Sequence, residues 1–330
     1  MNSWFRRSLV LSLVFGVASA AAFTSGCASI AIATAPSKAS SPNTSPAAND
    51  AEVTFWNTLH AGRYEGIDAA LDKLQAVYLE NPNDARTAAH IGFLHLWRLT
   101  ESAREPNLRP TITDEITLSR KYFGEAVSLD DSDPRFLGFL AAVTLAEGSI
   151  HHDEATTRRG YFAMKDAVSA WPEFNLFTRG YSMSRLPETD PMYQDAIADQ
   201  WDTLDRCAKE KVDRNSANFA PYMAAETREG RTRVCWNSAI APHNFEGFFM
   251  NMGDMIVKQG DAEKGRRIYA QAKLSKQYGA WPYREVLERR IEQAPENVAL
   301  FRVNDPREKR DKERRMMVDS PFGCVGCHQK

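Results

Sequence analysis

The stretch Phe248-Phe249-Met250-Asn251-Met252-Gly253 decides the fold that we expect for this chain. Its large apolar side chains suit a buried helix face, and Gly253 allows a second helix to pack closely because it has no side chain. Gly260-Asp261 then makes the turn between two helices. The segment that follows carries small and large residues in turn, at Gly265, Tyr269 and Ala272. The window therefore predicts two packed helices joined by a tight turn.

This window resembles a tetratricopeptide repeat, a helix–turn–helix unit of about 34 residues. Weaker echoes of the pattern occur at residues 62–82, 91–92 and 126–148, at irregular spacing. The resemblance implies a divergent array of stacked helix pairs, because each pair needs neighbours to bury its apolar face. It also implies a surface that holds a protein or peptide partner, and it implies no catalysis.

The pattern from about Ala51 to Ile291 is helical throughout. Apolar residues recur at three- and four-residue spacing, as at Leu71, Leu74 and Val77, and no sustained alternation of period two occurs. Stop signals follow such faces, for example at residues 81–84 and 130–134. We therefore predict an all-α fold, with a helical repeat domain over residues 51–300.

The composition limits the classes of function that we expect. The chain has 330 residues, 43% hydrophobic and 25% charged, which is typical of a folded protein with a buried core. A net charge of -2 gives no sign of nucleic-acid binding. No Ser-His-Asp or Cys-His constellation, glycine-rich phosphate loop or paired-carboxylate motif stands out, so no catalytic residue is predicted.

The N-terminus is typical of an exported protein. Arg6 and Arg7 precede an apolar run from Leu9 to Phe23, which is short for a membrane span and suits a signal peptide. We place the signal peptide at residues 1–26, before Cys27, because Thr24-Ser25-Gly26-Cys27 resembles a bacterial lipobox. Lipidated Cys27 would anchor the protein to a membrane. The alternative is cleavage after Ala20.

Residues 27–50 consist mainly of Ala, Ser, Pro, Thr and Asn. Such a segment buries too little apolar surface to offset its ordering entropy, so we expect a disordered tether. A spacer directly after Cys27 is consistent with a lipoprotein in the periplasm or associated with the outer membrane.

The C-terminal sequence Cys324-Val325-Gly326-Cys327-His328 has the spacing C-x-x-C-H. In an exported protein this spacing indicates covalent c-type haem attachment. The five residues resemble the haem-binding signature of c-type cytochromes. The resemblance implies that Cys324 and Cys327 bind the haem and that His328 is an axial ligand of the iron.

Other interpretations of the motif are a disulfide or half of a zinc site. The charged tail over residues 301–330 carries it, either away from the repeat domain or back onto it. His243, Met316 and Met317 are candidate sixth ligands. His151 and His152, followed by two acidic residues, are either metal ligands or a surface helix cap. His90 and His95 are expected to be packing residues.

The five cysteines are an odd number. With Cys27 assigned to lipid and the C-terminal pair to haem, Cys207 and Cys235 remain, and in an oxidising compartment they form the natural disulfide. The sequence thus predicts an exported helical-repeat protein with one covalent haem, acting in electron transfer or haem-linked assembly with a protein partner. The alternative is a non-haem interaction scaffold.

Overall fold

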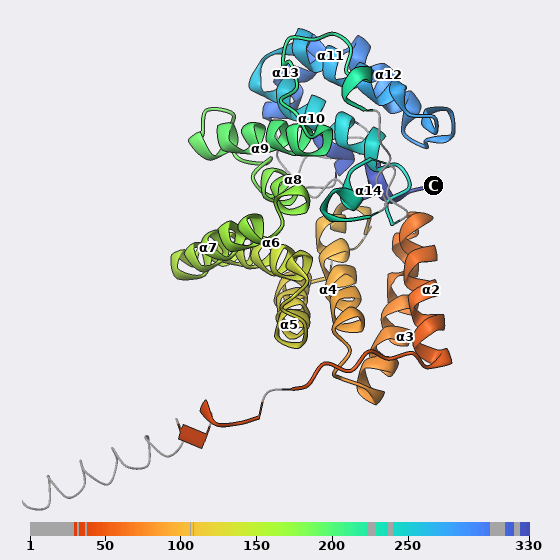
Figure 1. Cartoon of the computed structure of the whole chain (residues 1–330), viewed down its shortest axis with the longest axis vertical. Helices are drawn as coiled ribbons and strands as arrows, with labels where there is room; N and C mark the ends of the chain where they lie inside the picture. Colours follow the sequence, from red (N-terminus) through yellow and green to blue (C-terminus); the bar gives the residue numbers. More distant parts are fainter. Residues whose placement is uncertain are drawn as a thin grey trace, which may run out of the picture. The chain divides into compact units, whose positions relative to one another are not determined.

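The computed structural model describes residues 30–31, 33–36, 38–105, 107, 109–223, 229–236, 240–303, 314–319 and 324–330. The chain forms two separate units, residues 1–39 and 40–330. The predicted signal peptide, Cys27 and the alternative cleavage point lie outside the described residues. The second unit contains the helices discussed below (Figure 1).

Within the described residues the regular structure is helical and no β-strand occurs, so the all-α prediction is confirmed. The α-helices are α2 (Pro46–His60), α3 (Ile67–Glu80), α4 (Ala85–Thr100), α5 (Asp114–Leu129), α6 (Pro134–His151), α7 (Glu154–Ala170), α8 (Pro172–Ser182), α9 (Pro191–Ala208), α10 (Asn244–Gln259), α11 (Ala262–Gln271), α12 (Arg284–Glu292), α13 (Ala294–Arg302) and α14 (Cys324–His328). The short 3-10 helices are η1 (Tyr64–Gly66), η2 (Ser102–Arg104), η3 (Ala220–Tyr222), η4 (Arg231–Val234), η5 (Ala272–Leu274), η6 (Tyr278–Ala280) and η8 (Met316–Asp319).

Successive helices pack against each other along the chain. The most extensive contacts join α4 with α5, α6 with α7, α8 with α9 and α10 with α11. An aspartate begins many of these helices and accepts a hydrogen bond from a backbone amide of the first turn, which satisfies an otherwise unpaired donor. These capping residues are Asp84, Asp133, Asp153, Asp190 and Asp261.

The helix pair α10–α11 forms as the sequence predicts. A side chain at Gly253 would come within 2.3 Å of the Tyr269 ring, so the close contact between the helices requires glycine here. Gly260 ends α10 with a φ of 117°, and Asp261 caps α11 by accepting from the amide of Lys264 at 2.9 Å. The expected turn therefore joins two closely packed helices.

The helical unit begins before residue 51, where the sequence predicts the end of a disordered tether over residues 27–50. Helix α2 begins at Pro46, because Ser45 accepts a hydrogen bond from the amide of Ala48 and Pro46 suits a first helical position. Ala48 and Ala51 are buried. The boundary predicted at residue 50 thus falls inside a helix.

The C-terminal segment also packs more deeply than a charged tail would. Met316, Met317 and Val318 are buried, and α14 lies against α10. These short apolar runs belong to the core cluster that includes α10, whose residues are almost all buried. The described parts of residues 301–330 therefore return to the helical unit.

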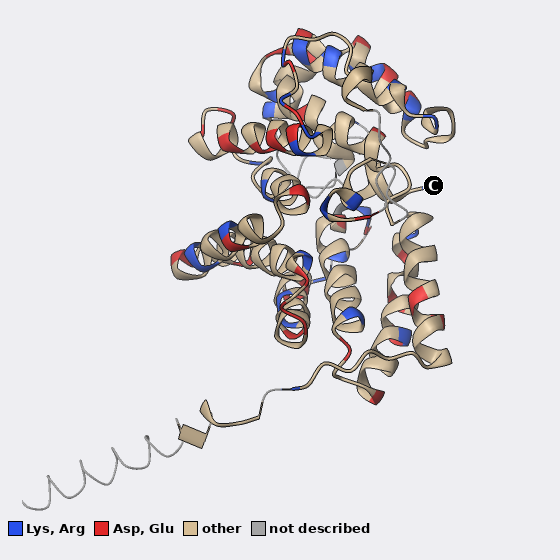
Figure 2. Cartoon of the chain, viewed as in Figure 1, with Lys and Arg blue, Asp and Glu red and all other residues tan. Residues whose placement is uncertain are grey.

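Charged residues of both signs alternate along the outer helices. Figure 2 shows basic and acidic positions mixed along α7, α11 and α12. Among the helices that the structure describes, none has both the length and the apolarity needed to cross a membrane.

Candidate functional site at the C-terminus

The C-x-x-C-H motif forms the single turn α14 and rests on α10 at Gly247. A side chain at Gly247 would lie 2.5 Å from Cys327 Sγ and 2.6 Å from the carbonyl carbon of Gly326. Gly326 also lies close to Met250, since a side chain there would lie 2.9 Å from Met250 Cε. The two glycines therefore allow the motif backbone to contact the core helix directly.

Hydrogen bonds from distant segments fix the motif backbone. Trp281 Nε1–H donates to the carbonyl oxygen of Gly326 at 2.9 Å. The amide of His243 donates to the carbonyl oxygen of Cys327, also at 2.9 Å. Both donors come from segments far from the motif in the sequence, so these bonds help to set the position of α14.

The residues after the motif bind the other end of the helical unit. The amide of Lys330 donates to the carbonyl oxygen of His60, the last residue of α2, at 2.8 Å. The Tyr283 hydroxyl donates to Gln329 Oε1 at 2.6 Å. The motif is thus held between the first helix of the unit and the α10–α12 region.

The two motif cysteines lie one helical turn apart, and residues with this spacing share one face of a helix. Cys324 is half-buried, whereas Cys327 is buried and is a free thiol. Burial, followed by the nearby Cys324 and the Glu246 carboxylate, raises the pKa of the Cys327 thiol. Cys327 is therefore a protonated thiol in the folded chain.

The imidazole of His328 lies among three rings from α2 and α4. Its centroid is 6.3 Å from that of Trp56, 6.0 Å from His60 and 6.5 Å from Phe93. Its Nδ1 atom is buried and has no hydrogen-bond partner. Burial is the main cause that lowers the pKa of His328 to about 4, so the ring is neutral, which is the form that binds a metal.

His60 and His328 converge on one backbone carbonyl. His60 Nε2 lies 2.9 Å from the carbonyl oxygen of Ile240, and the same carbonyl acts on His328, where it opposes the fall in pKa. Burial is the first cause that lowers the pKa of His60. The two neutral imidazoles therefore share the carbonyl oxygen of Ile240 as a neighbour.

A cavity of about 30 Å³ adjoins Cys327. Its wall includes the rings of Phe177, Tyr181, Trp236 and Phe248. The volume suits about one water molecule rather than a macrocycle. In chemical terms the residues fit a covalent haem, with two thiols on one helix face, an imidazole with an unpaired nitrogen and aromatic walls. In size, the group fits only when neighbouring side chains or loops move.

The disulfide predicted from the cysteine count joins positions beside this cavity. Cys207 at the end of α9 and Cys235 after η4 are disulfide-bonded, with Cα atoms 5.7 Å apart. Both residues line the cavity next to Cys327. The crosslink therefore fixes one wall of the site.

Other predicted ligands are engaged elsewhere. The Nδ1 atom of His243 lies 3.3 Å from Glu246 Oε1, and both side chains are buried. Met316 and Met317 pack in the core, where the Met317 amide donates to Asp254 Oδ2 at 2.6 Å. His243 therefore contacts the motif through its backbone amide, whereas its ring lies against Glu246.

The remaining histidines pack against other side chains or lie at a helix end. His90 stacks on Phe55 with centroids 4.1 Å apart, and His95 Nδ1 lies 2.6 Å from Glu115 Oε2. His151 and His152 end α6, with His152 in the left-handed conformation of a helix cap. In the described part of the chain, no group of three or more His, Cys, Asp or Glu side chains is placed to hold a metal ion.

Sequence reasoning missed the partners of His328. Trp56, His60 and Phe93 precede the motif by more than half the chain, so no local pattern connects them with it. One signal was present: Trp56 and His60 are four residues apart, a spacing that puts an indole and an imidazole on one helix face.

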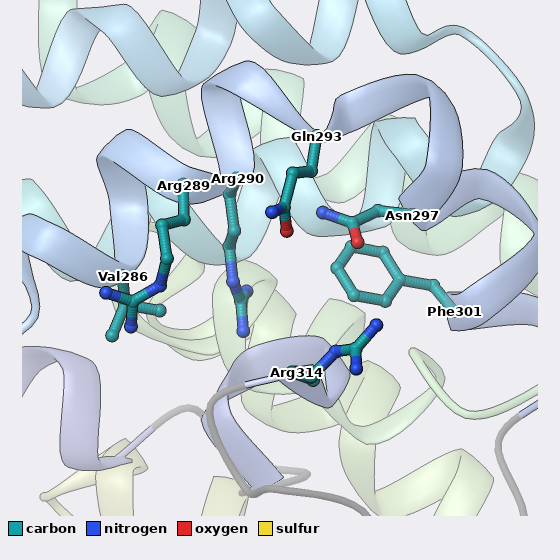
Figure 3. Close-up of a pocket in the computed structure, with 7 residues that line it drawn as sticks. All are labelled: Val286, Arg289, Arg290, Gln293, Asn297, Phe301 and Arg314. Carbon is teal, nitrogen blue, oxygen red and sulfur yellow. The ribbon is translucent and has the colours of Figure 1, made fainter.

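A larger cavity, of about 380 Å³, lies between α12 and α13. Figure 3 shows Arg289, Arg290 and Arg314 directed toward it, with Phe301 on one side. Arg290 is already bound there, because it pairs with buried Asp254 and donates to the carbonyl of Arg315 at 2.6 Å. None of the residues that line this cavity surrounds Cys327 or His328.

Comparison of the chain with protein-family models, with curated proteins and with solved structures finds no match in any of the three.

Proposed function

We propose that the chain carries one covalent c-type haem, attached through Cys324 and Cys327 with His328 as an axial ligand, and that it transfers electrons or supports haem-linked assembly. The observation that carries this proposal is the buried His328 imidazole, whose Nδ1 atom has no partner, next to two cysteines on one helix face. When bound, the iron supplies one-electron redox chemistry.

Attachment of the haem to the two cysteines needs no oxidant. Each thiol adds across one vinyl group of the haem, so that the sulfur bonds to one vinyl carbon and the thiol hydrogen ends on the other. The S–H bond and the π bond are lost, and nothing leaves. Because Cys327 is buried in the folded chain, the reaction belongs to a stage before α14 docks.

The protein contributes position and shielding. Trp281 and Gly247 fix the position of the motif against α10. The aromatic rings around His328 and Cys327 exclude water from these two side chains. A shielded, rigid site favours electron transfer because little reorganisation accompanies the change of charge. The helix pairs provide the surface for a protein redox or assembly partner.

The disulfide supports a proposal about the location of the protein. Disulfides such as Cys207–Cys235 persist in oxidising compartments, which supports export to the bacterial envelope. We propose a periplasmic or outer-membrane-associated lipoprotein, with Cys27 lipidated as a membrane anchor. Labelling with a fatty acid and mass spectrometry of the mature N-terminus test this part separately.

The second candidate function is a non-haem interaction scaffold with a C-terminal disulfide or metal clip. The stacked helix pairs support it equally well. Cys327 as a free thiol disfavours a disulfide clip. A zinc clip needs four ligands, and the described residues offer no cluster of three.

The test is expression of the full chain with c-type maturation machinery, followed by denaturation and extraction with acidified solvent. Haem should stay with the polypeptide, and the double variant Cys324→Ala/Cys327→Ala should lose it. The matched control is Cys207→Ser/Cys235→Ser, which removes two other cysteines and should keep the haem. A colourless wild-type protein with no added haem mass on its C-terminal peptide would leave only the scaffold function.

A further inference from the structure

We propose that the cavity between α12 and α13 binds a small organic anion, in which a carboxylate or phosphate group is attached to an apolar body. The cavity has a volume of about 380 Å³. Pockets that hold small molecules have volumes of roughly 300–1,000 Å³, so this one is large enough. It shares no lining residue with the cavity at Cys327, and the proposal does not depend on a haem.

The charged side chains on the wall of this cavity are positive. Figure 3 shows the side chains of Arg289, Arg290 and Arg314 directed toward the space. Of the described residues that line it, none is acidic. A guanidinium presents a planar fork of N–H donors that matches two oxygens of a carboxylate or a phosphate. The wall therefore favours an anion over a neutral or cationic ligand.

Arg290 is held in place from the core side. It is buried, pairs with Asp254 and donates to the carbonyl oxygen of Arg315 at 2.6 Å. Asp254 in turn accepts from the Tyr269 hydroxyl and the Met317 amide, each at 2.6 Å. The carboxylate of Asp254 compensates the charge of Arg290, so this arginine mainly gives the wall a fixed shape.

Arg289 and Arg314 are the arginines that we expect to contact the anion. Both are exposed, and they come from different segments, since Arg289 belongs to α12 and Arg314 precedes η8. Two guanidinium groups directed toward one space repel each other, and an anion between them replaces this repulsion by two attractions.

A buried amide adds a donor with a defined position. Asn297 lines the cavity and is only 6% exposed. Within the part of the chain that the structure describes, its side chain makes no hydrogen bond. Figure 3 shows the amides of Asn297 and Gln293 directed into the same space. A buried amide without a partner is costly, so an oxyanion that accepts from the Asn297 amide removes this cost.

The remaining wall is apolar, which favours an organic ligand over an inorganic ion. Val286 and Phe301 line the cavity and are buried, at 4% and 2% exposed. The guanidinium of Arg290 lies 5.4 Å from the centroid of the Phe301 ring. An apolar body attached to the anionic group would bury its surface against Val286 and Phe301, and this burial adds to the affinity.

Calorimetric titration of the full chain tests the proposal with benzoate, phenyl phosphate, benzyl alcohol and inorganic phosphate. We expect benzoate or phenyl phosphate, or both, to bind at millimolar or lower concentration, and the tighter of the two identifies the anionic group. Benzyl alcohol has the same ring without the charge and should bind about 10-fold more weakly or less, because hydrogen bonds to a charged group are the stronger ones.

The variant Arg314→Gln removes one guanidinium from an exposed position and should weaken binding of the preferred anion about 10–100-fold. The matched control is Arg284→Gln, a change at a half-exposed arginine of α12 that does not line the cavity, and it should leave the affinity unchanged. Circular dichroism verifies that both variants fold.

Three results would contradict the proposal. Failure of both organic anions to bind more tightly than benzyl alcohol would remove the anion site. Equal affinity for inorganic phosphate and phenyl phosphate would indicate an adventitious ion only, with no organic ligand. Equal losses for R314Q and R284Q would assign the binding to general surface charge instead of the cavity.

Discussion

The backbone amide of Met317 donates a hydrogen bond of 2.6 Å to the carboxylate of Asp254, a fully buried residue of α10. Tyr269 donates to the same carboxylate at 2.6 Å, and Arg290 pairs with it. One acidic side chain therefore connects α10, α11, α12 and the segment that leads to the motif.

Asp254→Ala should destabilise the protein strongly. It leaves Arg290 buried without its carboxylate, and breaking a buried pair in this way costs about 3–5 kcal/mol. Denaturant unfolding measures the change. Asp68→Ala is the control, because Asp68 pairs with Arg98 from a side chain that is 67% exposed and should cost no more than about 1 kcal/mol. Equal losses for the two variants would contradict the role of Asp254.

Gly247→Ala should displace α14 from α10. The new side chain would overlap Cys327 Sγ, and such overpacking costs about 1–3 kcal/mol. Gly124→Ala on α5 is the matched control, because its nearest neighbour would be Leu140 at 4.0 Å and the change should stabilise the helix by about 0.5–1 kcal/mol. Thermal unfolding of both variants decides; a neutral G247A would show that the motif does not rest on α10.

Removal of the Cys207–Cys235 bond should lower stability without releasing haem. The two residues are 28 apart, and the loop-closure entropy for this length corresponds to about 3.5 kcal/mol. Serine at both positions, compared with wild type by calorimetry, measures the effect. Ready alkylation of both thiols in the native wild type would disprove the bond.

His90 should make the fold sensitive to acid. Burial, and then Arg86 and Arg135, lower the pKa of His90 to about 3 from an ordinary value of 6.5. The folded state therefore resists protonation, so its stability is complete above pH 6.5 and falls as the pH drops from 6.5 toward 3. His90→Phe keeps a flat ring against Phe55 and should reduce this slope in urea unfolding at several pH values. An unchanged slope would show that other groups cause the acid sensitivity.

The two motif thiols should differ in reactivity in haem-free protein. Cys327 is buried and Cys324 is half-buried, so a thiol reagent should label Cys324 first and Cys327 only after unfolding. Peptide mass spectrometry over time measures both rates. Haem should likewise attach to the unfolded chain and not to the folded one. Equal labelling rates would mean that α14 leaves α10 readily.

The sequence allowed the local features of the fold to be predicted. Gly253, Gly260 and Tyr269 predict the α10–α11 pair because their effects act within one helix–turn–helix unit. The start of α2 was predicted too late, because the residues around Pro46 are small and polar enough to resemble a linker. Only the cap at Ser45 and the buried Ala48 show that the helix begins there.

The residues of the candidate motif could be recognised from the sequence, whereas their surroundings could not. Cys324, Cys327 and His328 form a contiguous motif, whereas His60 reaches His328 only through tertiary packing. Spacing along the chain carries no information about such a pair. The same limit applies to Gly247, whose closeness to Cys327 depends on how the C-terminal segment returns.

The bond between the Lys330 amide and the His60 carbonyl has a consequence for the folding of the whole unit. In an open repeat array each element contacts only its neighbours, so stability is a sum of local terms and the ends fray independently. Here a hydrogen bond joins the end of α2 to Lys330, so fraying of either segment should weaken the other. We therefore expect the end of α2 and the C-terminal segment to unfold together, as one cooperative step.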